Sequence, residues 1–166
     1  MDAERLTRAW LAIVPYYSDD KLAVELLDGD TSCILRGAVA WDAGKARWHV
    51  LANAAFDNKT IAGILFHELA HALHADVTKA IDGLASLDAD RDLILGRVSA
   101  GEKVGRSWAW RARQRAPKAR RAEDRAERWA AGELDLWWSW LQYGDVDAIR
   151  ARVNQAKSAG WAWLNS

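Results

Sequence analysis

The segment His67-Glu68-Leu69-Ala70-His71 constrains this chain more than any other part of its sequence. Its two histidines are four residues apart within an apolar stretch, and residues at that spacing share one face of a helix. Both imidazoles can then reach one metal ion, and Glu68 stands where a carboxylate can accept a proton from water. The segment therefore predicts a helix that carries a catalytic zinc site for metal-assisted hydrolysis. The alternative is a pair of core histidines on an amphipathic helix.

A zinc site of this kind needs a third protein ligand and keeps a fourth position for water. The extended motif that supplies a third histidine requires glycine at position 74 and histidine at position 77, where this chain has His74 and Val77. A straight helix cannot easily bring His67, His71 and His74 to one ion. We therefore expect His74 beside the ligands or facing the substrate, with an ordinary polar residue as the alternative.

A better source of the third ligand is the sequence from Glu123 to Ala130, which has the pattern E-x-x-A-E-x-W-A. Glu123 and Glu127 share a helix face, and two alanines allow that helix to pack closely against a neighbour. One carboxylate could bind zinc while the other orients a histidine. The alternative is a charged surface helix stabilised by pairs four residues apart. The other candidate ligands are Glu127, Glu102 and Glu133.

The pairing of H-E-L-A-H with this later helix resembles the ImmA/IrrE zinc metallopeptidases, and more loosely other gluzincins, over residues 46–135. The resemblance implies a zincin-like fold, zinc bound by His67, His71 and Glu123, and Glu68 as general base. It also implies a protein substrate, with a transcriptional repressor as one candidate. The long spacer before Glu123 suggests an insertion at 81–116. The candidate donors for the developing oxyanion are Tyr143, His49, Tyr16, Tyr17 and His74.

The order of predicted elements is that of an α+β protein, mostly helical, with one domain over 1–166. We expect a small sheet beside the motif-bearing helix and a helical C-terminal part. The strands are 34–41 and 46–51, joined as a hairpin by 42–45, while 22–27 is a strand or a helical turn. The helices are 2–14, ended by Pro15, then 58–80, a short one within 86–95, 106–116, 118–143 and 146–158, with caps at Asp57-Asn58 and Asp145.

Composition indicates which partners and which cellular compartment to expect. Positive and negative residues balance to a net charge of zero, so we expect no direct nucleic acid binding and no anionic membrane partner. Cys33 is the only cysteine, which fits a reducing compartment, and we expect a cytoplasmic protein. Eleven tryptophans, gathered mainly in the C-terminal half, are typical of core or interface packing. The competing hypothesis is therefore a catalytically weak regulatory module whose Trp-rich and Arg-rich half binds another protein.

Overall fold

The computed structural model describes residues 1–74, 76–97 and 117–159, and within them the fold is α+β and mostly helical, as predicted. A three-stranded sheet has the order β1-β3-β2. Its strands are β1 (Leu22–Leu27), β2 (Gly37–Asp42) and β3 (Arg47–Asn53). The helices are α1 (Ala3–Leu11), η1 (Val14–Tyr16, a 3-10 helix), α2 (Asn58–Leu73), α3 (Leu84–Ile94), α5 (Pro117–Leu141) and α6 (Val146–Ser158). The predicted helix at 106–116 lies outside the described residues.

The sheet is mixed, because β1 runs parallel to β3 while β2 runs antiparallel to it. The predicted hairpin is confirmed: in its turn, the backbone N–H of Lys45 donates to the Asp42 carboxylate over 3.0 Å. The ambiguous segment 22–27 is a strand and lies at the edge of the sheet opposite β2. The predicted strand at 34–41 begins later, at Gly37, and Ile34 is exposed.

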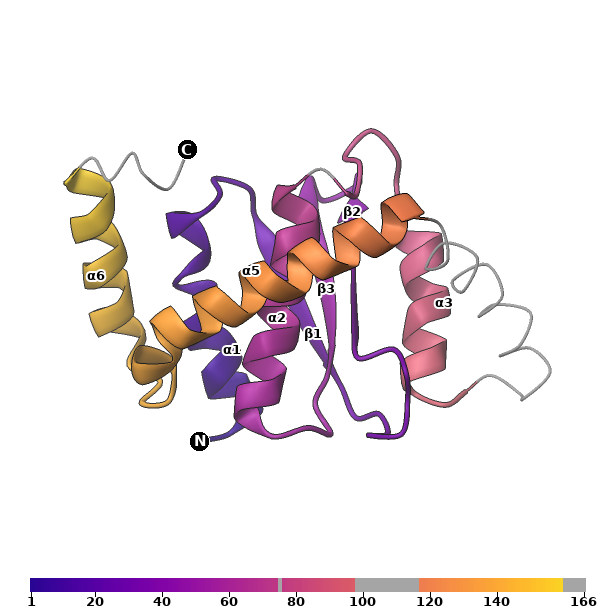
Figure 1. Ribbon diagram of the computed structural model, residues 1–166, viewed down its shortest axis with the longest axis horizontal. Coiled ribbons are helices and arrows are strands. Elements are labelled where there is room, and N and C mark those ends of the chain that lie inside the picture. The colour runs from indigo at the N-terminus through magenta and orange to yellow at the C-terminus, as the bar shows by residue number, and fades with distance from the viewer. Residues whose placement is uncertain (75, 98–116, 160–166) are drawn as a thin grey trace.

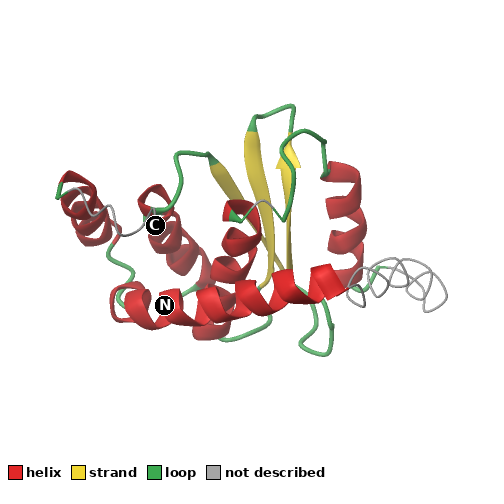
Figure 2. Ribbon diagram, turned by 45° about the horizontal axis from the view of Figure 1, so that its top comes forward, coloured by secondary structure: helices red, strands yellow, loops and turns green. Residues whose placement is uncertain are grey.

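Strand alternation divides the sheet into two faces, each covered by helices (Figures 1 and 2). The larger core joins one face, through Val50 and Ala52, to α1, α2, α5 and α6. A smaller cluster joins the other face, through Leu27, Ala38 and Leu51, to α3. The motif-bearing helix α2 therefore lies between the sheet and the long helix α5, which crosses it in Figure 1.

Two predicted helix ends need correction. The helix expected to run to residue 80 ends at Leu73, where His74 leaves helical geometry as the C-cap. The side chain of Asp76 is then free to turn back toward the helix and contact His71. The first helix ends at Leu11 rather than Val14, and Pro15 lies inside η1, where its missing N–H is not needed at the start of a helical turn.

Several of the predicted helix caps and helix ends are confirmed. Asp57 caps α2 by accepting the backbone N–H of Thr60 over 2.9 Å, and Asp145 caps α6 in the same way. Gly144, with φ of +60°, follows the end of α5, where a left-handed residue favours glycine. Helix α5 passes through Gly132 without interruption.

The tryptophans of α5 pack as aromatic side chains in a core do. Trp137 is buried edge-on against Tyr16, and Trp129 packs in the same way against Tyr17 and Phe66. Trp140 is more exposed. Trp108, Trp110, Trp161 and Trp163 lie outside the described residues. No helix among the described ranges is both long enough and apolar enough to cross a membrane.

Candidate metal centre

Three side chains from two helices come together at one point of the fold. His67 and His71 project from α2, one turn apart, and Glu123 projects from the first third of α5. Helix α5 can approach closely because buried Ala126 and Ala130 face its neighbours. The ligand atoms of these three residues lie within 4.8 Å of one another. The structure thus brings together the three residues that the sequence singled out as metal ligands.

The spacing of these atoms fits a metal ion. Nε2 of His67 lies 3.1 Å from Nε2 of His71. One Glu123 oxygen, Oε2, lies 3.0 Å from the first nitrogen, and the other, Oε1, lies 3.2 Å from the second. Ligands at about 2.0–2.1 Å from a tetrahedral zinc ion are about 3.3 Å apart, close to each of these separations. A hydrogen bond between the two Nε2 atoms uses the lone pair of only one histidine, whereas a metal ion bound between them would accept both lone pairs. The donor set of two imidazoles and one carboxylate suits zinc.

The charges of His67, His71 and Glu123 shift one another's pKa values. Burial by itself lowers the pKa of His67 and of His71, but the hydrogen bond to Glu123 and the charge of Glu68 outweigh it and raise both. Burial raises the pKa of Glu123, and its hydrogen bonds to the two histidines reverse this, holding the pKa far below its usual range. Glu123 is therefore ionised at neutral pH.

Glu68 lies one residue after His67 and is only 7% exposed. Burial raises its pKa to about 7, although the neighbouring histidines oppose the shift. A Cβ placed on Gly37 of β2 would lie 3.0 Å from a carboxylate oxygen of Glu68, so the strand backbone closes over this side chain. A carboxylate with a pKa near neutrality can both accept and return a proton.

The second nitrogen of each histidine also has a carboxylate partner. Nδ1 of His67 lies 3.2 Å from Glu127, as the sequence suggested for one of the two glutamates. Nδ1 of His71 lies 3.3 Å from Asp76. Sequence reasoning missed Asp76, because it assigned residue 76 to the continuing helix. An aspartate five residues after the second histidine, where the apolar pattern stops, was the available signal.

Four other predicted residues lie elsewhere. His74 caps α2, its Nδ1–H donating to the carbonyl of Ala70 over 2.7 Å, and its ring packs edge-on against Trp129. His49 points to the α3 face of the sheet, where it contacts Glu25. The Tyr17 hydroxyl accepts from Trp137 over 2.8 Å and donates to Glu133, so both of these groups already have partners. Burial raises the pKa of Glu133.

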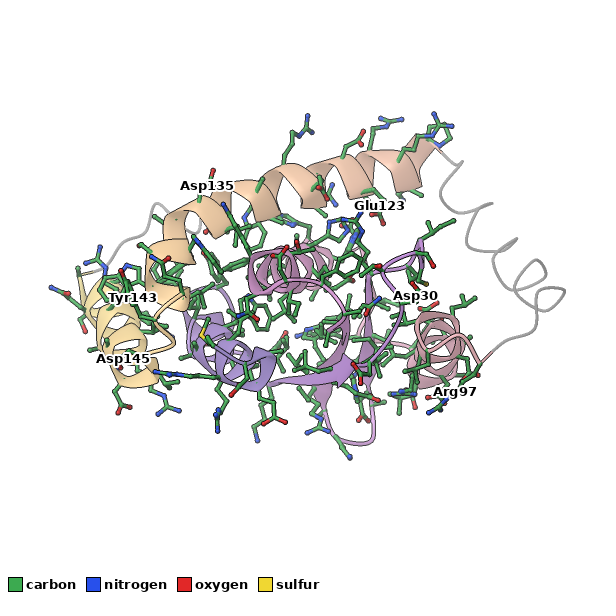
Figure 3. All side chains as sticks on the ribbon, turned by 90° about the horizontal axis from the view of Figure 1, so that it is seen from below. Asp30, Arg97, Glu123, Asp135, Tyr143 and Asp145 are labelled. Carbon is green, nitrogen blue, oxygen red and sulfur yellow. The ribbon has the colours of Figure 1, made fainter. Side chains whose placement is uncertain are left out.

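Tyr143 is not a neighbour of the site. It follows the far end of α5, and the 18-residue separation of Glu123 and Leu141 corresponds to about 27 Å of helix. Figure 3 shows Glu123 and Tyr143 at opposite ends of this helix. Tyr143, a candidate oxyanion donor, is therefore too distant to act at this site, and Glu133, about 15 Å along the helix from Glu123, does not join the metal ligands. Glu102 lies outside the described residues.

Comparison with known proteins gives no family assignment: no family model, curated protein or solved structure matches this chain.

Proposed function

We propose that this protein is a zinc-dependent metallopeptidase that hydrolyses a peptide bond of a protein substrate. One observation carries the proposal: the two histidine nitrogens and the Glu123 carboxylate lie 3.0 to 3.2 Å from one another, beside the buried carboxylate of Glu68. Burying ionisable side chains costs free energy, and apolar side chains would pack α2 against α5 without that cost. A cluster of perturbed pKa values around one point is typical of a functional site.

Each residue has a role in the proposed reaction. His67, His71 and Glu123 would hold zinc, which when bound makes a water ligand more acidic and polarises a carbonyl oxygen. Glu68 accepts the proton of the attacking water and returns it to the leaving amine. Its burial beneath the β2 backbone disfavours the charged carboxylate, which helps it to accept the proton.

The position of β2 favours a peptide over a small molecule as substrate. Within the described residues β2 pairs with no strand other than β3. The Trp41 carbonyl near its C-terminal end accepts from the backbone N–H of Gly83, so we propose that an extended chain pairs with the edge at the Gly37 end. Gly37 of this strand lies against Glu68, so a peptide added at that edge would pass close to the general base. The family resemblance adds that the substrate is an intracellular protein, with a transcriptional repressor as one candidate. The proposed location is the cytoplasm, which agrees with a single cysteine.

The test combines zinc content with cleavage of a pool of random-sequence fluorogenic peptides. We expect one zinc per chain after reconstitution and cleavage by the wild-type protein. Glu68→Gln should bind zinc equally and lose about 10²–10⁴-fold in rate, because it removes the base but no ligand. The matched control is Asp124→Asn, an exposed carboxylate on α5.

The outcomes separate the hypotheses. Equal zinc binding with equal behaviour of wild type and Glu68→Gln would leave the catalytically weak binding module in place of the enzyme. Less than one zinc per chain, with no uptake on reconstitution, would reject the metal centre itself.

A further inference from the structure

We infer that Asp76 is a positioning residue for His71 and that Arg125 of α5 holds Asp76 in place, so that zinc affinity depends on an arginine that never touches the metal. This inference rests on the proposed metal centre. Neither residue belongs to the ligand set.

The first step is the orientation of the His71 ring. Its Nε2 faces His67 and Glu123, while its Nδ1 lies 3.3 Å from a carboxylate oxygen of Asp76. A carboxylate at Nδ1 favours the proton on that nitrogen and leaves the Nε2 lone pair for a metal. It also fixes the plane of the ring and makes the imidazole a stronger donor.

The second step is the confinement of Asp76. Its side chain is 17% exposed, and its other carboxylate oxygen pairs with a guanidinium nitrogen of Arg125. The side chain of Arg125 is 43% exposed, but its Nε is buried, so part of the guanidinium lies against the protein. Asp76 is thus held between the end of α2 and α5, by two partners on two segments.

The third step links this contact to the packing of α5 on α2. Arg125 follows Glu123 by two residues, so one stretch of helix supplies both the third ligand and the cation that holds Asp76. The segment that carries Asp76 is secured further along, where Lys79 pairs with Asp20 over 2.5 Å and lies above the Trp41 ring. A shift of α5 would therefore disturb two of the three ligands at once.

Glu127 provides an internal comparison. It makes the corresponding contact with His67, at 3.2 Å, but its side chain is 80% exposed. Exposed pairs of this kind compete with water and contribute little. The two histidines are therefore held unequally, and Asp76 should matter more than Glu127.

The test is the affinity for Zn²⁺ alone, measured by competition with a chromophoric chelator. Asp76→Ala should lose about 10–100-fold, the usual effect of removing the partner of a metal-binding histidine. Glu127→Gln should lose no more than about fivefold. Arg125→Gln should weaken binding in the wild-type background and change it by less than about twofold in the Asp76→Ala background, because it acts only through Asp76. Arg128→Gln, an exposed arginine on the same helix, is the matched control and should leave the affinity unchanged.

A second readout separates positioning from general destabilisation. The visible absorption of bound Co²⁺ reports the geometry of its ligands and should change in Asp76→Ala but not in Arg128→Gln. Should Asp76→Ala fail to fold, Asp76→Asn keeps an acceptor without the charge and is expected to lose about tenfold in affinity.

Two results would overturn the inference: unchanged Zn²⁺ affinity in the folded Asp76 variant, or equal losses from Arg125→Gln in both backgrounds. A wild-type protein that binds no Zn²⁺ would instead refute the proposed function.

Discussion

The carboxylate of Glu123 lies 3.0 Å from Nε2 of His67, although 56 residues separate the two in the chain. This contact joins the two longest helices of the described residues and completes a three-donor site. It depends on small side chains, because Ala126 and Ala130 are the buried residues that bring α5 against its neighbours next to Glu123.

The ligand assignment predicts unequal effects of two similar substitutions on α5. Glu123→Ala should lower Zn²⁺ affinity by more than about 100-fold, since losing a direct ligand exceeds the effect of losing a ligand's partner. Glu133→Ala should leave the affinity within about twofold, because Glu133 pairs with Tyr17 and lies about 15 Å away along the helix. Chelator competition measures both, and equal losses would show that the third ligand is wrongly assigned.

The close packing of Gly37 predicts that even a methyl group there is harmful. A Cβ on Gly37 would lie 2.6 Å from a methyl carbon of Ile64 and 3.0 Å from Glu68. Gly37→Ala should therefore lower the free energy of unfolding by about 1–3 kcal/mol, as overpacking does, and displace the general base. Chemical denaturation measures the first effect and the peptide-cleavage rate the second.

Gly132→Ala is the control for this experiment. Apart from its chain neighbours and the nearby backbone of its own helix, no described atom lies within 4 Å of the Cβ that the substitution would add to α5. The change should raise the free energy of unfolding by about 0.4–1 kcal/mol, because alanine restricts the unfolded chain and favours a helix. A Gly37→Ala protein as stable as wild type would contradict the close approach of β2 to α2.

The contact between Glu25 and Arg91 predicts a pH dependence remote from the metal centre. Hydrogen bonds from Arg91, 2.7 and 2.8 Å long, hold the pKa of Glu25 below its usual value, and His49 acts in the same direction. The stabilisation is therefore present above the pKa of the unfolded chain and is lost as pH falls through the lower pKa of the folded state. Glu25→Gln should destabilise the protein at pH 7 by no more than about 1 kcal/mol, since the pair is partly exposed, and by progressively less below about pH 4.

Asp147→Asn is the matched control for that pair. Asp147 lies 3.6 Å from Arg150 on α6, and both side chains are well exposed. Thermal unfolding of this variant should follow the wild type across the pH range. A deficit of Glu25→Gln that stays constant from pH 7 to pH 3 would contradict the assigned pKa shift.

The sequence predicted the parts of this molecule that local rules determine. The spacing of His67 and His71 within an apolar run predicted a buried helix, and Asp57 predicted its start. The pattern around Glu123 predicted a second helix close to the first, because alanines every four residues form a smooth face. These are properties of neighbouring residues, and they need no knowledge of the tertiary fold.

The parts that depend on tertiary contacts were not predictable in the same way. Strand β1 pairs with β3 rather than with β2, its nearer neighbour in sequence, and alternation of residues carries no information on that order. Beyond the end of α2, Asp76 contacts His71 and also Arg125, a residue on another helix, and no local pattern shows this pairing. The position of Tyr143, by contrast, follows from the predicted helix at 118–143, because its 20-residue separation from Glu123 corresponds to about 30 Å of helix.

A crystal structure of the protein grown with zinc, with anomalous diffraction recorded at the zinc edge, tests the central claim most directly. The account predicts one strong peak bonded to Nε2 of His67, Nε2 of His71 and a carboxylate oxygen of Glu123, each at about 2.0–2.2 Å. A crystal that shows no peak there, or a peak whose third protein ligand is a residue other than Glu123, would contradict it.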